Sequence, residues 1–195
     1  MKNKVLLTII LTIYILFPII IFLNTSLYEI KFYILTVLGL MIFLIMKLFK
    51  LSNRDLGISK DNILSSVKRN ALFVIACVVI IVICKILHIN RYEPNETIYF
   101  YIFYILISCP LQEFLYRGVF GYFEKIMASK YLWLILSSFC YSFVHIIYKD
   151  ILTCMLTFII GIVWYLLYRK DYNLIGVSLS HIVLGILTIS LGVIN

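Results

Sequence analysis

Residues 5–23 have the sequence VLLTIILTIYILFPIIIFL, which is apolar on every side of a helix. Runs of about 18 or more such residues are typical of bilayer-spanning helices, because lipid offers no hydrogen-bond partner to an exposed backbone. The preceding Met1-Lys2-Asn3-Lys4 resembles the start of a signal peptide. The apolar run is too long for a signal peptide, however, and no small-residue cleavage site follows it. We therefore interpret residues 5–23 as an uncleaved first span.

Six further apolar segments follow, which makes the chain an all-α, polytopic transmembrane bundle of about seven spans. Of the 195 residues, 64% are hydrophobic, and the mean hydropathy is +1.08. A soluble domain is usually about 45–50% apolar, so these values predict one membrane domain over residues 1–195. The expected spans are residues 5–23, 32–48, 71–89, 98–120, 132–148, 151–168 and 174–194.

The charges support this count. With the N-terminus inside, the inner loops hold twelve of the 17 Lys and Arg residues and the outer loops hold four, Arg117 lying within a span. Lys and Arg are retained on the cytoplasmic side, so this bias predicts a cytoplasmic N-terminus. The net charge of +8 therefore reflects topology, and no basic stripe suggests nucleic acid as a partner. The expected partners are membrane lipids and a peptide or protein substrate in the membrane.

Residues 51–70 form the only sizeable polar segment. Ser59-Lys60-Asp61-Asn62 before Ile63, Leu64 and Val67 is typical of a capped amphipathic helix, which we expect on the cytoplasmic face. Residues 121–130 are similar. All five cysteines fall within apolar runs and none has Cys-x-x-Cys spacing, so we interpret them as small buried hydrophobic residues.

Glu113 and Arg117 lie inside the fourth span, in the sequence CPLQEFLYRG of residues 109–118. They are four residues apart and therefore share one helix face. The pair either fixes a helix interface or belongs to a functional site, since ionisable groups inside spans are costly and by default mark function. Pro110, one turn earlier, is expected to kink or weaken the helix and open a pocket to water.

Two histidines lie in later spans, His145 in the fifth and His181 in the seventh. At 1.5 Å per residue, both histidines and Glu113 fall between the inner half and the middle of the membrane. One carboxylate and two imidazoles suit a divalent metal such as zinc, with water as the fourth ligand. They equally suit a site that activates water without a metal. Lys85 and His88 near the outer end of the third span are expected to reach the interface, although His88 could join the site.

These residues resemble the motifs of the CAAX prenyl protease and bacteriocin-processing (Abi) family of intramembrane proteases. The family carries Glu-Glu-x-x-x-Arg, Phe-x-x-x-His and His-x-x-x-Asn/Asp on successive spans. Residues 112–118 (QEFLYRG), 141–145 (YSFVH) and 181–185 (HIVLG) are similar to these motifs in order and spacing. The resemblance covers residues 108–185 and implies a catalytic core there, with Gln112, Glu113, Arg117, His145 and His181 as site residues.

The sequence departs from the family pattern at two polar positions. Gln112 stands where the family has a water-activating carboxylate, and an amide cannot accept a proton. Glu113 would then be the base or ligand. Gly185 replaces Asn or Asp, which removes a side chain able to orient water, a histidine or an oxyanion. Tyr141 in place of Phe adds a hydroxyl that could form a hydrogen bond.

Three functions remain open from the sequence. The first is an intramembrane endopeptidase, either metal-dependent or of a glutamate type. The second is a non-enzymatic relative acting in bacteriocin immunity or as a membrane partner protein, for which Gln112 and Gly185 are the main support. The third is a small transporter in which the buried Glu, Arg and His residues relay protons. The high Lys, Asn and Ile content is compatible with an A/T-rich bacterial genome, and so with a bacterial plasma membrane. Because bacteria generally lack prenylated proteins, a peptide substrate of another kind fits better.

Overall fold

The regular secondary structure of the described residues is all helical, without strands. The computed structural model describes residues 2–89, 91–127 and 129–193. The α-helices are α1 (Lys2–Leu23), α2 (Thr25–Glu29), α3 (Lys31–Leu48), α4 (Ile63–Ile86), α5 (Ile98–Phe103), α6 (Cys109–Glu113), α7 (Val119–Met127), α8 (Lys130–Phe143), α9 (Ile151–Asp171) and α10 (Leu174–Ser190). Two π-helical turns, η1 (Tyr104–Ser108) and η2 (Phe114–Gly118), and one 3₁₀ turn, η3 (Val144–Tyr148), join some of them.

Six helices are long and apolar enough to cross a membrane, and α10 is a shorter apolar helix. The predicted all-α bundle of about seven spans is therefore confirmed, and the chain is a multi-pass membrane protein. The fourth segment is longer than predicted, because residues 98–127 form one continuous helix that includes part of the polar stretch 121–130. The predicted end of the last span, Ile194, lies outside the described residues.

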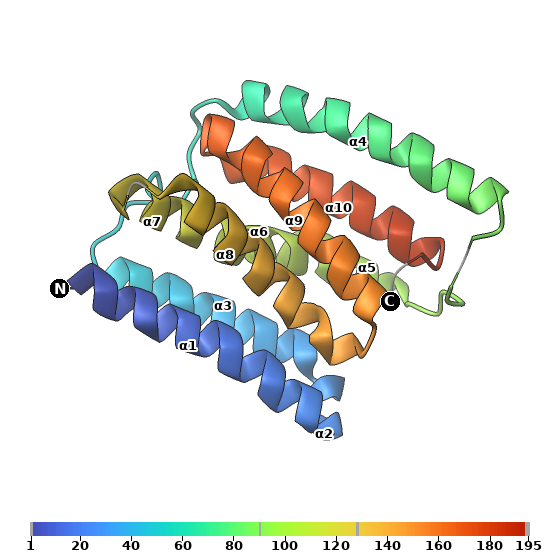
Figure 1. Ribbon diagram of the computed structural model, residues 1–195, viewed down its shortest axis with the longest axis horizontal. Coiled ribbons are helices and arrows are strands. Elements are labelled where there is room, and N and C mark those ends of the chain that lie inside the picture. The colour runs from blue at the N-terminus through green and yellow to red at the C-terminus, as the bar shows by residue number, and fades with distance from the viewer. Residues whose placement is uncertain (1, 90, 128, 194–195) are drawn as a thin grey trace.

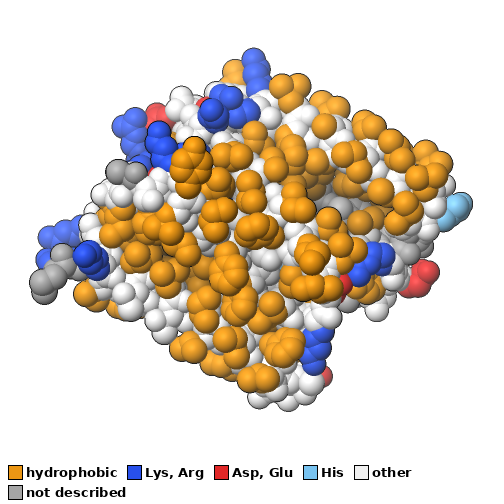
Figure 2. Space-filling view, viewed as in Figure 1, with side chains coloured by type: hydrophobic (Ala, Val, Ile, Leu, Met, Phe, Trp, Pro, Cys, Tyr) orange, Lys and Arg blue, Asp and Glu red, His pale blue; other side chains and the backbone are white. Residues whose placement is uncertain are grey.

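The helices lie side by side along the long axis of the molecule (Figure 1). α1 and α3 form one flank, α4 lies on the opposite flank against α9 and α10, and α6 and α8 run between them. Figure 2 shows a broad hydrophobic face, with Lys and Arg gathered mainly at the end where the N-terminus lies. The long fourth segment is thus central, and both flanks can contribute walls to a site on it.

The polar segment 51–70 has a different structure from the predicted separate helix. Residues 51–62 form turns, and α4 begins at Ile63, directly after the predicted cap, and continues through the third span. Asn173 holds these turns in place, since its side-chain amide donates to the carbonyls of Ser59 and Asp61. The apolar residues after the cap simply continue into the span, so one helix forms where two were expected.

Asp150 lies in the short connection between the fifth and sixth spans and is the N-cap of α9. Its carboxylate caps α9 by accepting from the backbone amides of Leu152 and Thr153, at 3.2 Å each. The same carboxylate pairs with both terminal nitrogens of Arg91, at 2.8 and 3.0 Å. The Arg91 amide donates to the Gly192 carbonyl at 2.7 Å. Asp150 and Arg91 therefore tie the start of α9, the loop after α4 and the end of α10 together.

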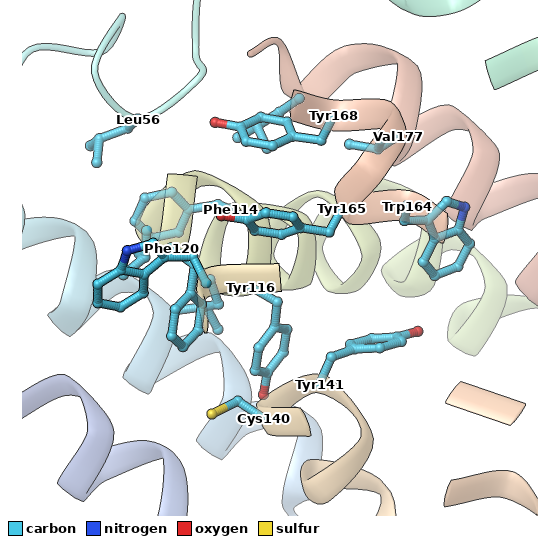
Figure 3. Packing of buried hydrophobic residues seen from close by; sticks show 14 of the residues in the cluster. Leu56, Phe114, Tyr116, Phe120, Cys140, Tyr141, Trp164, Tyr165, Tyr168 and Val177 are labelled. Carbon is cyan, nitrogen blue, oxygen red and sulfur yellow. The ribbon is translucent and has the colours of Figure 1, made fainter. Parts of the chain in front are cut away.

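Aromatic side chains fill the core between the flanks (Figure 3). Tyr116 packs between the rings of Tyr14 from α1 and Tyr141 from α8, with centroids 5.3 and 5.5 Å away. The Tyr14 hydroxyl donates to the Leu115 carbonyl at 2.7 Å. This packing fixes the fourth segment against α1 and α8, and so fixes the positions of the polar residues it carries.

Candidate active site

Glu113 and Arg117 lie where the fourth segment changes helical geometry. Glu113 ends the regular turn α6, and Arg117 belongs to the π-helical turn η2 that follows. A second π-helical turn, η1, precedes α6. Pro110, near the start of α6, has no amide hydrogen and therefore removes one donor from the helical ladder. Single π-helical turns are frequent at functional sites because they redirect side chains without ending the helix.

Glu113 bridges Arg117 and His181 in the protein interior. His181 Nδ1 donates to Glu113 Oε1 at 2.7 Å. Arg117 Nε lies 3.1 Å from Glu113 Oε2, and both side chains of this pair are fully buried. Because a carboxylate only accepts, the hydrogen of a neutral His181 is on Nδ1, and Nε2 keeps its lone pair. The structure thus brings together three of the predicted site residues on two segments 60 and more positions apart.

Arg117 is fully buried but poorly satisfied by hydrogen bonds. Its three guanidinium nitrogens have no hydrogen-bond partner among the described residues, because the contact with Glu113 lacks hydrogen-bond geometry. The guanidinium instead lies over the ring of Tyr141 at 4.4 Å and near that of Trp164 at 5.4 Å. Figure 3 shows these two rings side by side, from α8 and α9. Arg117 therefore balances the charge of Glu113 from a site enclosed by aromatic rings.

His145 also contacts Tyr141. Its Nδ1 is 2.7 Å from the Tyr141 carbonyl oxygen, which only accepts, so Nδ1 is again the donor and Nε2 is free. The Tyr141 ring contacts both histidines, with centroids 5.0 Å from His145 and 5.8 Å from His181. Its hydroxyl lies 3.4 Å from His181 Nε2, which is the hydrogen bond that Tyr141 was predicted to add. Both histidines thus contact the same tyrosine, and Nδ1 is the donor in each.

A cavity of about 620 Å³ connects these residues. His145, His181, Tyr141 and Gln112 line it, whereas Glu113 and Arg117 do not. Its other walls are mostly apolar and come from α4, α9, α10 and the fourth segment. A cavity of this size and character fits a peptide side chain or a short apolar chain. Glu113 therefore reaches the cavity only through His181, a relationship that the sequence did not predict.

Gln112 is the residue at the position where the family carries its water-activating carboxylate. It is half-buried, and its amide nitrogen donates to the Ser108 hydroxyl at 2.9 Å. Gln112 and His145 also line a second cavity of about 80 Å³, between α1, α3 and η3. The two cavities thus share Gln112 and His145, together with Lys31, Phe32 and Tyr148.

Several neighbours of the site carried no clear signal in the sequence. Trp164 packs on His181 with ring centroids 4.5 Å apart and donates to Ser180 at 2.9 Å. Tyr104 approaches the same histidine edge-on at 5.9 Å. The hydrogen bond between Ser108 and Gln112 could have been anticipated, because residues four apart share a helix face. His88, by contrast, is exposed beyond the end of α4 and does not line the cavity.

The donor groups do not form a metal site as arranged. No group of three His, Cys, Asp or Glu side chains among the described residues is placed to hold a metal ion. Both carboxylate oxygens of Glu113 face protein groups, Oε1 meeting His181 and Oε2 meeting Arg117, whereas His181 and His145 bond through Nδ1 and keep Nε2 as a possible ligand atom. A zinc ion needs at least three ligand atoms directed at one point. Metal ligation by Glu113, His145 and His181 therefore stays a prediction of the sequence.

Comparison with known proteins supports the family resemblance of the motifs. Residues 94–187 match the family described as type II CAAX prenyl endopeptidase Rce1-like. The match includes every predicted site residue and both π-helical turns. Neither the curated proteins nor the solved structures gave a match. Through residues 94–187, the chain is therefore similar to the CAAX protease family of membrane proteases.

Proposed function

We propose that this protein is an intramembrane endopeptidase in which His181 is the general base and Glu113 orients it. The observation that carries the proposal is the 2.7 Å bond between His181 Nδ1 and Glu113 Oε1 at the wall of the large cavity. A carboxylate in this position holds the imidazole in one tautomer and stabilises the imidazolium that forms when Nε2 accepts a proton. The substrate class is membrane-associated peptides or proteins.

The proposed reaction is hydrolysis of a peptide bond. Water transfers a proton to His181 Nε2 while its oxygen adds to the carbonyl carbon, giving a tetrahedral intermediate with a negative oxygen. The carbon–nitrogen bond then breaks, and the proton on His181 passes to the leaving nitrogen. His145 Nε2 accepts a hydrogen bond from the same water and holds it near the carbonyl carbon. Arg117 pairs with Glu113 and acts on the reaction through that carboxylate.

The two cavities support separate routes for peptide and water. The large apolar cavity suits the peptide, and the cavity of about 80 Å³ has room for a few water molecules. Lys31, Gln112 and His145 give the small cavity the polar partners that water requires. We infer that water enters from the α1–α3 side and meets the peptide at His145. The excess of Lys and Arg in the inner loops further supports a cytoplasmic N-terminus. The residue composition supports a bacterial plasma membrane.

The test is cleavage of membrane-tethered peptides by the purified protein in lipid vesicles. Wild-type protein is expected to cleave, and His145→Ala and His181→Ala variants are expected to lose at least about 100-fold in kcat. Leu179→Ala, at an exposed position on the same helix as His181, serves as control. Absence of cleavage across a broad peptide library, or equal rates in all four proteins, would overturn the proposal.

A further inference from the structure

Gly185 and Tyr104 form a complementary pair at the wall of the cavity. Gly185 lies one helical turn after His181 on α10, and both residues line the cavity together with Tyr104. A Cβ atom at residue 185 would collide with the Tyr104 hydroxyl and lie only 2.7 Å from the carbon that bears it. The missing side chain of Gly185 therefore creates the space into which the Tyr104 hydroxyl reaches.

The ring of Tyr104 is held in this position. It stacks on Phe100, one turn earlier, with centroids 5.6 Å apart and an interplanar angle of 28°. It also meets the His181 ring nearly at right angles, at 83°. Tyr104 starts the π-helical turn η1 and is buried apart from its cavity face. A hydroxyl fixed by packing loses little freedom when it binds a ligand, which is a requirement for stabilising a transition state.

We propose that the Tyr104 hydroxyl is a catalytic residue of this protein, donating a hydrogen bond to the carbonyl oxygen of the bound peptide. The inference rests on the proposed peptidase function and adds the group that stabilises the negative oxygen. Tyr104 thereby supplies from the fourth segment a polar group that the sequence lacks at residue 185. Arg117 cannot fill this role, since it does not line the cavity.

The geometry around His181 agrees with this assignment. Tyr104, Tyr141 and Trp164 surround the imidazole with centroids 5.9, 5.8 and 4.5 Å away. The Tyr141 hydroxyl is already directed at His181 Nε2, so it competes for the base rather than for the substrate oxygen. Tyr104 presents its hydroxyl over Gly185 instead, one helical turn further along α10. The base and the proposed oxyanion donor are thus separate groups on neighbouring walls.

The experiment compares Tyr104→Phe with Tyr99→Phe, which removes an identical hydroxyl from an exposed position on the preceding helix. Tyr104→Phe is expected to lower kcat by about 10- to 100-fold with KM and thermal stability little changed, because only the transition state carries the negative oxygen. Tyr99→Phe is expected to match wild type. Equal kcat in the two variants would overturn the role of Tyr104 while the peptidase function stands.

A rescue and a binding measurement make the test independent of fold and of turnover. Tyr104→Ala with Gly185→Asn removes the collision and returns a polar group to the wall, so it is expected to exceed Tyr104→Ala alone in kcat by about 10-fold.

Binding of a peptide with a phosphinate in place of the scissile bond needs no turnover. Tyr104→Phe is expected to weaken it by about 10-fold. If wild type does not cleave, the peptidase function fails, and equal phosphinate binding in wild type and Tyr104→Phe overturns the Tyr104 assignment separately.

Discussion

His181 Nδ1 and Glu113 Oε1 are 2.7 Å apart, although the two residues are separated by 68 positions in the chain. Glu113 is fully buried and does not line the cavity, whereas His181 does. In the proposed reaction, the histidine is therefore the group that meets the substrate, and the buried glutamate acts through it. This arrangement assigns separate roles to two residues that the sequence presented as equal candidates for one site.

Glu113→Gln is expected to lower kcat by about 100-fold or more, because a neutral amide cannot stabilise the imidazolium of His181. KM should change little. The matched control is Glu124→Gln, which neutralises another buried glutamate that pairs with Arg169 at 2.9 Å and is not part of the cavity wall. Steady-state cleavage of a membrane-tethered peptide measures kcat and KM for the two variants. A larger loss in Glu124→Gln, after correction for folded protein, would contradict the role of Glu113.

Gln112→Glu is expected to raise kcat by about 10-fold or more. The substitution keeps the size of the side chain and places a carboxylate at the junction of the two cavities, beside His145, where it can accept a proton from water. The gain should grow as the pH rises and the new carboxylate ionises. Gln112→Met, of similar length without a polar end, should show no gain. A Glu variant no faster than the Met variant would argue against a water site at this junction.

Chelation is expected to leave peptide cleavage unchanged, because both oxygens of Glu113 face protein groups and the Nε2 atoms of His181 and His145 alone are fewer than the three protein ligands of a catalytic zinc site. The measurement is the cleavage rate before and after dialysis against a strong chelator, with metal content followed by elemental analysis. Loss of activity that returns with zinc, at about one ion per chain, would show instead that the residues rearrange into the metal site that their types allow.

Asp150→Ala is expected to destabilise the protein by about 1–2 kcal/mol, since it removes both the cap of α9 and the pair with Arg91. Arg91→Ala removes only the pair, which is partly exposed, and should cost about 1 kcal/mol or less. Thermal unfolding in detergent compares the two. Equal effects would show that the cap contributes nothing.

The same pair should make stability depend on pH. The Arg91 guanidinium and the Thr153 hydroxyl hold the pKa of Asp150 well below its usual value of 3.8. A lowered pKa means that this stabilisation is fully present above the unfolded-state pKa and is lost as the pH falls towards the folded one. The difference between wild type and Asp150→Ala should therefore shrink below about pH 4. A difference that widens on acidification would contradict the ion pair.

Cysteine labelling tests the orientation, which the loop charges predict. With the native cysteines replaced, Lys60→Cys is expected to be protected from an impermeant thiol reagent in intact cells, and Lys149→Cys to react. The physical reason is that Lys and Arg are retained on the cytoplasmic side. The opposite labelling pattern would place the N-terminus outside.

The sequence by itself determined that this is an all-helical membrane protein, and it located most spans to within a few residues. Hydropathy suffices for this because lipid forces every spanning segment to satisfy its own backbone hydrogen bonds. The extent of α4 was less predictable, because no glycine or proline separates the polar start at Ile63 from the apolar run. The site residues were recognisable too, since buried ionisable groups are rare and their spacing resembled a known family.

Only the tertiary structure decided which of these residues meet and which face the cavity. Glu113 and Gln112 are adjacent in the chain, yet the first is enclosed with Arg117 and the second lines both cavities. That choice depends on how the fourth segment, with its two π-helical turns, packs against α8 and α10. Likewise, the absence of a side chain at Gly185 acquires meaning only from the hydroxyl of Tyr104, 81 positions earlier in the chain. Helix rotation and interhelical packing involve contacts distant in sequence, and local patterns do not encode them.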